Sequence, residues 1–122
     1  MSYQIDTFDD LIRIKFYGVL DALDLILLNQ SKDYKLAIQN KNKMLMDFTD
    51  IEGSALTAED ARGLAMLGNR DSQRVKNLHL VIASDPISAP AMQHLCGKVF
   101  ADSGWQVDIV ESVAEGQQLF AP

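Results

Sequence analysis

The stretch KMLMDFTDIEGSALTAED, from Lys43 to Asp60, decides the fold because it predicts a strand, a turn and a helix in succession. Its apolar start predicts a buried strand formed by Met44, Leu45, Met46 and Phe48. The residues that follow are typical of a turn: Asp50, Glu52, Gly53 and Ser54. Thr57 then caps a helix, because its hydroxyl can accept a backbone N–H and Asp60 can reach back to it. Open α/β folds usually hold functional residues at such a turn, so Ser54 is the first candidate.

The composition predicts one globular domain over residues 1–122. Hydrophobic residues make up 48% and charged residues 23% of the chain, as is ordinary for a soluble protein. Acidic residues number 17 and basic residues 11, and the net charge of −6 disfavours nucleic acid and anionic lipid as partners. The acidic start, MSYQIDTFDD, lacks a signal-peptide pattern, and every apolar run is too short to span a membrane. We therefore expect a cytoplasmic protein without membrane insertion.

Strand patterns precede the deciding stretch and one helical pattern leads into it. Strands at Tyr3–Phe8 and Leu11–Tyr17 are expected to form an antiparallel hairpin, with Gly18 ending the second strand. One helix is then expected from its cap at Asp21 to about Ile38. Its buried stripe follows from a rotation of about 100° per residue: Leu20, Leu23, Ile26, Leu27, Tyr34, Ala37 and Ile38.

Helices and strands continue to alternate after Thr57. The helix that Thr57 caps should reach about Val75 and bury Ala61, Leu64, Ala65, Gly68 and Val75. The later elements are a strand at Leu78–Ala83, a helix capped by Ser88 with Pro90 in its first turn, a strand at Trp105–Val110, and a helix from Ser112 or Val113 to Phe120. The order ββαβαβαβα predicts an α/β fold whose four- to five-stranded mixed sheet is parallel outside the first hairpin.

Three leucines of the first expected helix lie away from its buried stripe. Leu25 and Leu36 should point away from it, and Leu28 should lie on its flank. Two interpretations stay open: the leucines form an exposed patch for a partner or a second copy, or the chain's own hairpin or last helix covers them. The oligomeric state expected is a monomer or a weak homodimer.

No residue pattern predicts an enzyme, a cofactor or a metal site. Cys96 falls on the apolar stripe of its helix (Met92, Leu95, Cys96 and Val99), and His94 points away from it, so Cys96 is expected in the core. The chain has no glycine-rich phosphate loop, no G-x-S-x-G elbow and no metal-ligand spacing. The carboxylates of Asp47, Asp50 and Glu52 could hold a cation, although charged turn residues are usually only hydrated. Catalytic residues, cofactors and metals are each expected to be none.

Several segments together resemble the STAS domain of SpoIIAA-like anti-sigma factor antagonists. The segments are IKFYGVLDA (14–22), MLMDFTDI (44–51), LHLVIASDP (78–86) and SGWQVDIVESVAEGQQLF (103–120). The resemblance covers nearly the whole chain and implies a STAS fold. It further implies a non-catalytic regulatory module that binds an anti-sigma factor or a kinase-like protein. The alternative is a STAS-type sensor domain that binds a small molecule or a lipid.

The resemblance assigns a specific expectation to Ser54. In the family, the turn after the central strand commonly reads Asp-Ser-Ser-Gly-Leu, and a partner kinase phosphorylates its second serine. The matching residues are Glu52-Gly53-Ser54-Ala55-Leu56, which depart from the family at Glu52, Gly53 and Ala55. The resemblance implies that Ser54 is the phospho-acceptor, with Thr57 as the less favoured choice. Otherwise Ser54 is a solvated turn residue and Thr57 only a cap.

The partner-binding candidates surround this turn. They are Asp50, Glu52, Gly53, Arg62 and Arg70. A phosphate on Ser54 would add nearly two negative charges beside the acidic residues Asp50 and Glu52. This added charge could release a bound partner. The alternative for the arginines, with Arg74, is a solvated helix face that pairs with Glu59 and Asp71.

Overall fold

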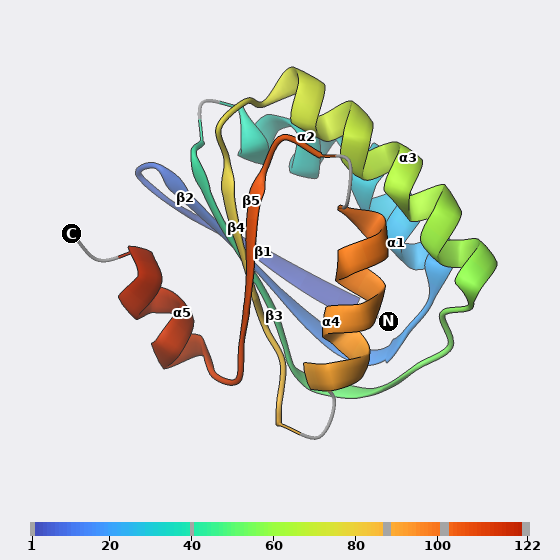
Figure 1. Cartoon of the computed structure of the whole chain (residues 1–122). Helices are drawn as coiled ribbons and strands as arrows, with labels where there is room; N and C mark the ends of the chain where they lie inside the picture. The colour runs from blue at the N-terminus through green and yellow to red at the C-terminus, as the bar shows by residue number, and fades with distance from the viewer. Residues whose placement is uncertain (1, 40, 87–88, 101–102, 121–122) are drawn as a thin grey trace.

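The computed structural model describes residues 2–39, 41–86, 89–100 and 103–120 (Figure 1). Five strands form one sheet in the order β1-β2-β3-β4-β5. Their bounds are β1 (Ser2–Phe8), β2 (Leu11–Leu20), β3 (Lys43–Ser54), β4 (His79–Ala83) and β5 (Gln106–Val110). β1 pairs antiparallel with β2, and each later pair is parallel. The expected mixed sheet with its antiparallel first hairpin is confirmed.

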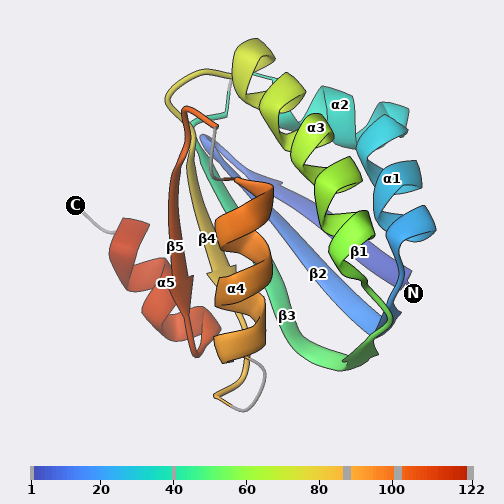
Figure 2. The same cartoon turned by 45° about the vertical axis from the view of Figure 1, so that its right-hand side comes forward.

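Helices cover the two faces of the sheet unequally, as Figures 1 and 2 show. On one face lie α1 (Ala22–Gln30), α2 (Lys32–Ile38), α3 (Ala58–Arg74) and α4 (Ala89–Val99). On the other face lies α5 (Val113–Phe120), whose bounds match the expected last helix. The expected cap Ser88 lies outside the described residues. In the part of the chain that the structure describes, no helix is both long and apolar enough to cross a membrane.

The larger core lies between the sheet and the helices α1 to α4. Alternation in β2 directs Ile12, Ile14 and Phe16 into this core, where all three are fully buried. Leu80 and Ile82 of β4 join them from the middle of the sheet. Because Val81 and Ala83 of the same strand are buried on the opposite face, β4 is buried on both faces as its apolar sequence predicted.

The smaller core lies under α5. Leu45, Val81 and Ala83 form it, with Val113 and Phe120 of α5 packed against them. Gly116 allows the close approach of this helix. A Cβ at that position would lie 3.0 Å from Leu45 Cδ1 and 3.1 Å from Val81 Cγ1. The helix therefore packs with its backbone close to the sheet.

The prediction of a single helix from Asp21 to Ile38 is wrong, because the chain forms two helices that meet at Ser31. Ser31 is in the extended conformation, with ψ at 147°. Its Oγ accepts a hydrogen bond from Tyr34 N at 3.1 Å and donates one to Leu28 O at 2.7 Å. These bonds end α1 and begin α2, because a serine hydroxyl can replace the backbone bonds that a continuous helix would make.

This break changes which residues of α1 are buried. Leu23 and Leu27, expected on the buried stripe, are 63% and 58% exposed, and Ile26 is also exposed. Leu28 is buried instead, and Leu25 packs against the core rather than pointing away from it. Three expectations nevertheless hold: Tyr34 and Ile38 are buried, and Leu36 is 55% exposed. Leu20, also expected on the stripe, is buried at the end of β2.

Two strands run further than the sequence indicated. Gly18 does not end β2 but continues it with a positive φ of 80°, next to the register shifts between Lys15 and Tyr17 and between Gly18 and Val19. β3 continues through the expected turn, and Ser54 is its last residue. Pairing with the extended end of β2 provides partners for this backbone, so tertiary context overrides the local turn signal.

Candidate functional site

The carboxyl end of β3 presents Ser54 to solvent. Ser54 pairs with Leu20 at the end of β2, and Ala55 N donates to Leu20 O at 2.8 Å. The Ser54 Oγ accepts a local hydrogen bond from Leu56 N at 3.2 Å. The Ser54 side chain is therefore exposed while the backbone around it is fixed by the sheet.

The Thr57 side chain is the N-cap of α3. Its Oγ1 accepts from Asp60 N at 3.2 Å, and Asp60 Oδ2 accepts from Thr57 N at 2.8 Å. This reciprocal pair is the capping box that the sequence predicted. Ser54 is thus the less constrained of the two candidate hydroxyls.

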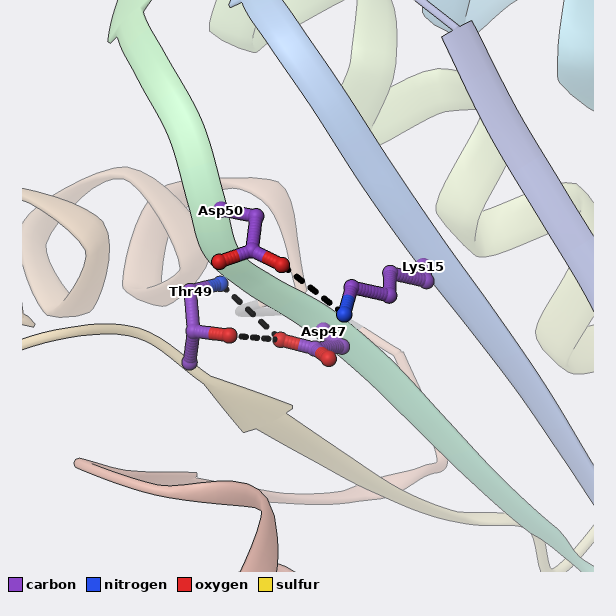
Figure 3. Close-up of polar contacts among 4 residues, drawn as sticks. All are labelled: Lys15, Asp47, Thr49 and Asp50. Atoms are coloured by element: carbon purple, nitrogen blue, oxygen red, sulfur yellow. Dashed lines mark hydrogen bonds and ion pairs between the residues drawn. The ribbon is translucent and has the colours of Figure 1, made fainter.

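Asp50 of β3 is held by an ion pair to Lys15 of the neighbouring strand β2 (Figure 3). Lys15 Nζ lies 2.8 Å from Asp50 Oδ2 and 5.5 Å from the centre of the Tyr17 ring. The hydrogen bond to Asp50 raises the pKa of the Lys15 amine. Asp50 is therefore paired within the chain although its side chain remains exposed, and Glu52 is exposed as well.

Asp47 is almost fully buried beside this pair, at 1% exposure. Its Oδ1 accepts from Thr49 N at 2.9 Å and from Thr49 Oγ1 at 2.6 Å, as Figure 3 shows. Nowhere in residues 2–39, 41–86, 89–100 and 103–120 do three His, Cys, Asp or Glu side chains come together to hold a metal ion. The cation site considered for Asp47, Asp50 and Glu52 does not form.

An apolar strip, defined as Leu23, Ile26 and Leu27, runs along the outer surface of α1. The three residues stand at helical spacings of three and four, which puts them on one face of the helix. α1 begins two residues after Leu20, the β2 partner of Ser54. The strip therefore starts close to the exposed serine, a juxtaposition that the expected continuous helix had hidden.

The arginine candidates lie at different positions along the axis of α3. Arg62 and Arg70 are both exposed, as expected. Arg62 is in the second turn of α3, near Ser54, and Arg70 is about 12 Å further along the helix at 1.5 Å per residue. Only Arg62 belongs to the same end of the molecule as Ser54.

Asp71 was expected to pair with arginines at the surface, but it is buried at 4% exposure. Its Oδ2 accepts hydrogen bonds from Tyr34 Oη at 3.0 Å and from Asn29 Nδ2 at 2.7 Å. Burial raises the pKa of the Asp71 carboxyl, and the two hydrogen bonds partly oppose that shift. Burial and the Asp71 charge also raise the pKa of the Tyr34 phenol. This buried group, absent from the sequence prediction, joins α1, α2 and α3.

An apolar cavity of about 110 Å³ lies next to this buried group, between the sheet and α1, α3 and α4. Its walls are mainly aliphatic and aromatic, with Phe16 and Phe48 stacked at 4.6 Å between ring centroids. Asn29, Tyr34 and Asp71 supply polar groups at its wall. The sequence did not predict this cavity, because the lining residues come from segments far apart in the chain.

Cys96 and His79 have structural roles, and His94 does not contribute to the site. Cys96 is buried, as expected, and burial raises the pKa of its thiol to about 12. His94 is exposed on α4. His79 Nε2 lies 2.6 Å from Asp108 Oδ2, a bond between β4 and β5, and its ring meets the Phe120 ring edge-on. These contacts tie β4, β5 and α5 together.

Solved structures with the same fold cover nearly the whole chain. An anti-sigma factor antagonist from Mycobacterium paratuberculosis matches with a TM-score of 0.62 and 11% identity, over 97% of this chain and 92% of that chain. The anti-sigma factor antagonist SpoIIAA in its unphosphorylated form matches with a TM-score of 0.60 and 15% identity, over 98% and 96%. An uncharacterized protein of the DUF3478 family with a SpoIIAA-like fold, from Shewanella loihica PV-4, matches with a TM-score of 0.58 and 16% identity, over 98% and 93%.

The resemblance to the STAS fold is thereby confirmed, and the chain has a SpoIIAA-like fold. No protein-family model and no curated protein sequence matches the chain. At 11% to 16% identity the likeness establishes the fold alone.

Proposed function

We propose that this chain is a non-catalytic regulatory module that binds a protein partner through the surface around Ser54. The observation that carries the proposal is an exposed hydroxyl whose strand partner, Leu20, lies two residues before α1 and its apolar strip. Two of the matching structures are anti-sigma factor antagonists, which supports an anti-sigma factor or a kinase-like protein as the partner. In this proposal the chain binds its partner and catalyses no reaction.

The apolar strip supplies most of the affinity in this proposal. Burying one leucine or isoleucine side chain contributes about 1.5–3 kcal/mol, whereas an exposed ion pair contributes about 0–1 kcal/mol. Glu52 and Arg62 are exposed and can orient the partner by charge. Asp50 is also exposed, and Lys15 balances part of its charge.

Phosphorylation of Ser54 is the proposed switch. A phosphate would add about 1.5–2 negative charges beside the exposed Glu52, and a bound partner would have to desolvate them. The phosphorylated chain would therefore release a partner seated on the apolar strip. Thr57 is less suited to this role, because modification of its hydroxyl would remove the capping bond to Asp60 N.

Quantitative affinity purification from the cells that produce the protein tests both parts of the proposal. Leu27→Glu should abolish recovery of the partner, while Leu36→Glu should leave it unchanged, since the two leucines are similarly exposed on different helices. Ser54→Asp should reduce recovery at least tenfold, and Ser54→Ala should not. Mass spectrometry should find one phosphate on the residues of the Ser54 turn. Equal recovery with Leu27→Glu and Leu36→Glu would contradict the proposed surface, and equal recovery with Ser54→Asp and Ser54→Ala would contradict the switch.

A second candidate function is the small-molecule sensor. It is favoured by one observation, the apolar cavity of about 110 Å³ between the sheet and the helices. Apolar pockets with a few polar groups are the usual form of small-molecule sites. Ser54 does not line this cavity, although its neighbours Leu20 and Leu56 do, so both functions can exist in one molecule.

A further inference from the structure

The wall of the cavity beside Asp71 differs in polarity from one side to the other. Most of it is apolar, with Leu25 and Leu28 of α1, Leu64 and Leu67 of α3, and Ile82 of β4 among the lining residues. The Trp105 indole also lines it, but its Nε1 donates to Val75 O at 2.6 Å and is not available to a ligand. A molecule inside would therefore meet hydrocarbon on most sides and polar atoms on one side.

That polar side has an acceptor with spare capacity. Both hydrogen bonds to Asp71, from Tyr34 and from Asn29, reach Oδ2, and within the described residues none reaches Oδ1. A carboxylate oxygen can accept more than one hydrogen bond. The two donors also fix the carboxylate in orientation, because they come from two different helices, α1 and α2.

We propose that the cavity binds a compact, mostly apolar molecule that carries one hydroxyl group, with the hydroxyl donating to Asp71 Oδ1. This inference rests on the second candidate function and names its ligand class. A carboxylate accepts from a hydroxyl more strongly than a neutral group does. A ligand with only acceptor atoms would face the carboxylate without a donor and would be rejected.

The cavity volume limits the size of this ligand. An apolar cavity of about 150 Å³ accommodates benzene, which has six heavy atoms. At about 110 Å³ the cavity should hold four or five heavy atoms without rearrangement. A four-carbon alcohol meets both the size and the hydrogen-bonding requirement.

The test is an NMR titration of the full chain with 2-butanol and with butanone. The two probes share the same carbon skeleton and number of heavy atoms, but only the alcohol can donate a hydrogen bond. Methyl signals of Leu28, Leu64 and Ile82 report on the wall, and those of Leu36 serve as the control outside it. We expect 2-butanol to shift the wall signals saturably, with an affinity about tenfold above that of butanone.

Two variants separate the polar contact from the cavity itself. Asp71→Asn keeps the size of the side chain but adds an N–H donor, so the preference for the alcohol should disappear. Leu64→Phe adds volume at a half-buried lining residue and should weaken both probes. The comparison of the two probes on the unmodified chain needs neither variant to fold.

Each outcome has a distinct meaning. Saturable shifts with equal affinities for the two probes would overturn the hydroxyl-bearing ligand class but retain a small-molecule site. Shifts from neither probe at the wall would overturn the class and the second candidate function together. Neither result bears on partner binding at Ser54, which affinity purification tests separately.

Discussion

The Tyr34 hydroxyl donates a hydrogen bond to Asp71 over 3.0 Å and so connects α2 to α3 across 37 residues of sequence. Both side chains are nearly fully buried. A hydrogen bond to a charged group in such surroundings is stronger than one at the surface, and its loss leaves the carboxylate less well compensated.

Tyr34→Phe should therefore destabilise the fold. Among the described residues, the variant leaves Asp71 with the Asn29 bond alone, and we expect a loss of about 1–3 kcal/mol in the free energy of unfolding. Urea denaturation followed by circular dichroism measures it. Tyr3→Phe, at an exposed position of β1, is the matched control and should change the stability by less than about 0.5 kcal/mol. Equal stability of the two variants would show that the bond to Asp71 is energetically neutral.

Asp71 should also make the stability depend on pH. Burial raises the pKa of its carboxyl above the ordinary value of 3.8, so the folded chain binds this proton more tightly than the unfolded chain. Its contribution favours folding below 3.8 and is lost as the pH rises through the folded-state pKa. The free energy of unfolding of the wild type, minus that of Asp71→Asn, should increase between pH 7 and about pH 4. A difference that is constant or falls on acidification would contradict the direction of the shift.

Cys96 should be unreactive in the folded chain. Burial raises the pKa of its thiol to about 12, so the nucleophilic thiolate is scarce at pH 8. We expect a thiol reagent such as iodoacetamide to label Cys96 at least a hundredfold more slowly in buffer than in denaturing urea. The labelling is quantified by intact-mass spectrometry. Comparable rates in the two conditions would mean that the side chain is accessible.

Gly116→Ala should weaken the packing of α5 on the sheet. The added methyl group would lie 3.0 Å from Leu45 Cδ1 and 3.1 Å from Val81 Cγ1, in a fully buried cluster. We expect a loss of about 1–3 kcal/mol in the free energy of unfolding. Gly63→Ala in α3 is the control, since nothing lies within 4 Å of its Cβ position, and it should gain up to about 1 kcal/mol from helix propensity. A stabilised Gly116→Ala variant would mean that α5 moves freely to accommodate the methyl group.

Local patterns were enough to predict the sheet and most of the helices. The apolar run before Pro86 identified β4, and the spacing of Thr57 and Asp60 identified the start of α3. In each case the signal lies within one segment of the chain. The bounds of α5 followed from the same kind of information.

Features that depend on distant partners could not be predicted in this way. Ser31 is compatible with a helix by local pattern, and only the packing of α1 and α2 reveals the break there. The strand at Gly18 and Gly53 persists because β2 and β3 pair with each other. Asp71 was assigned to the surface because its partners, Tyr34 and Asn29, lie in segments far from it. The cavity escaped prediction for the same reason.

The helix α1, which ends at the break at Ser31, has one side exposed to solvent and one side buried. Leu27 faces solvent on one side, while Leu28 and Asn29 reach the cavity and Asp71 on the other. A protein seated outside and a molecule held inside would thus act on the same nine-residue helix. Whatever factor the inner molecule applies to the affinity of the outer protein, the outer protein must apply to the affinity of the inner molecule. The two proposed sites therefore share one structural element, the helix α1.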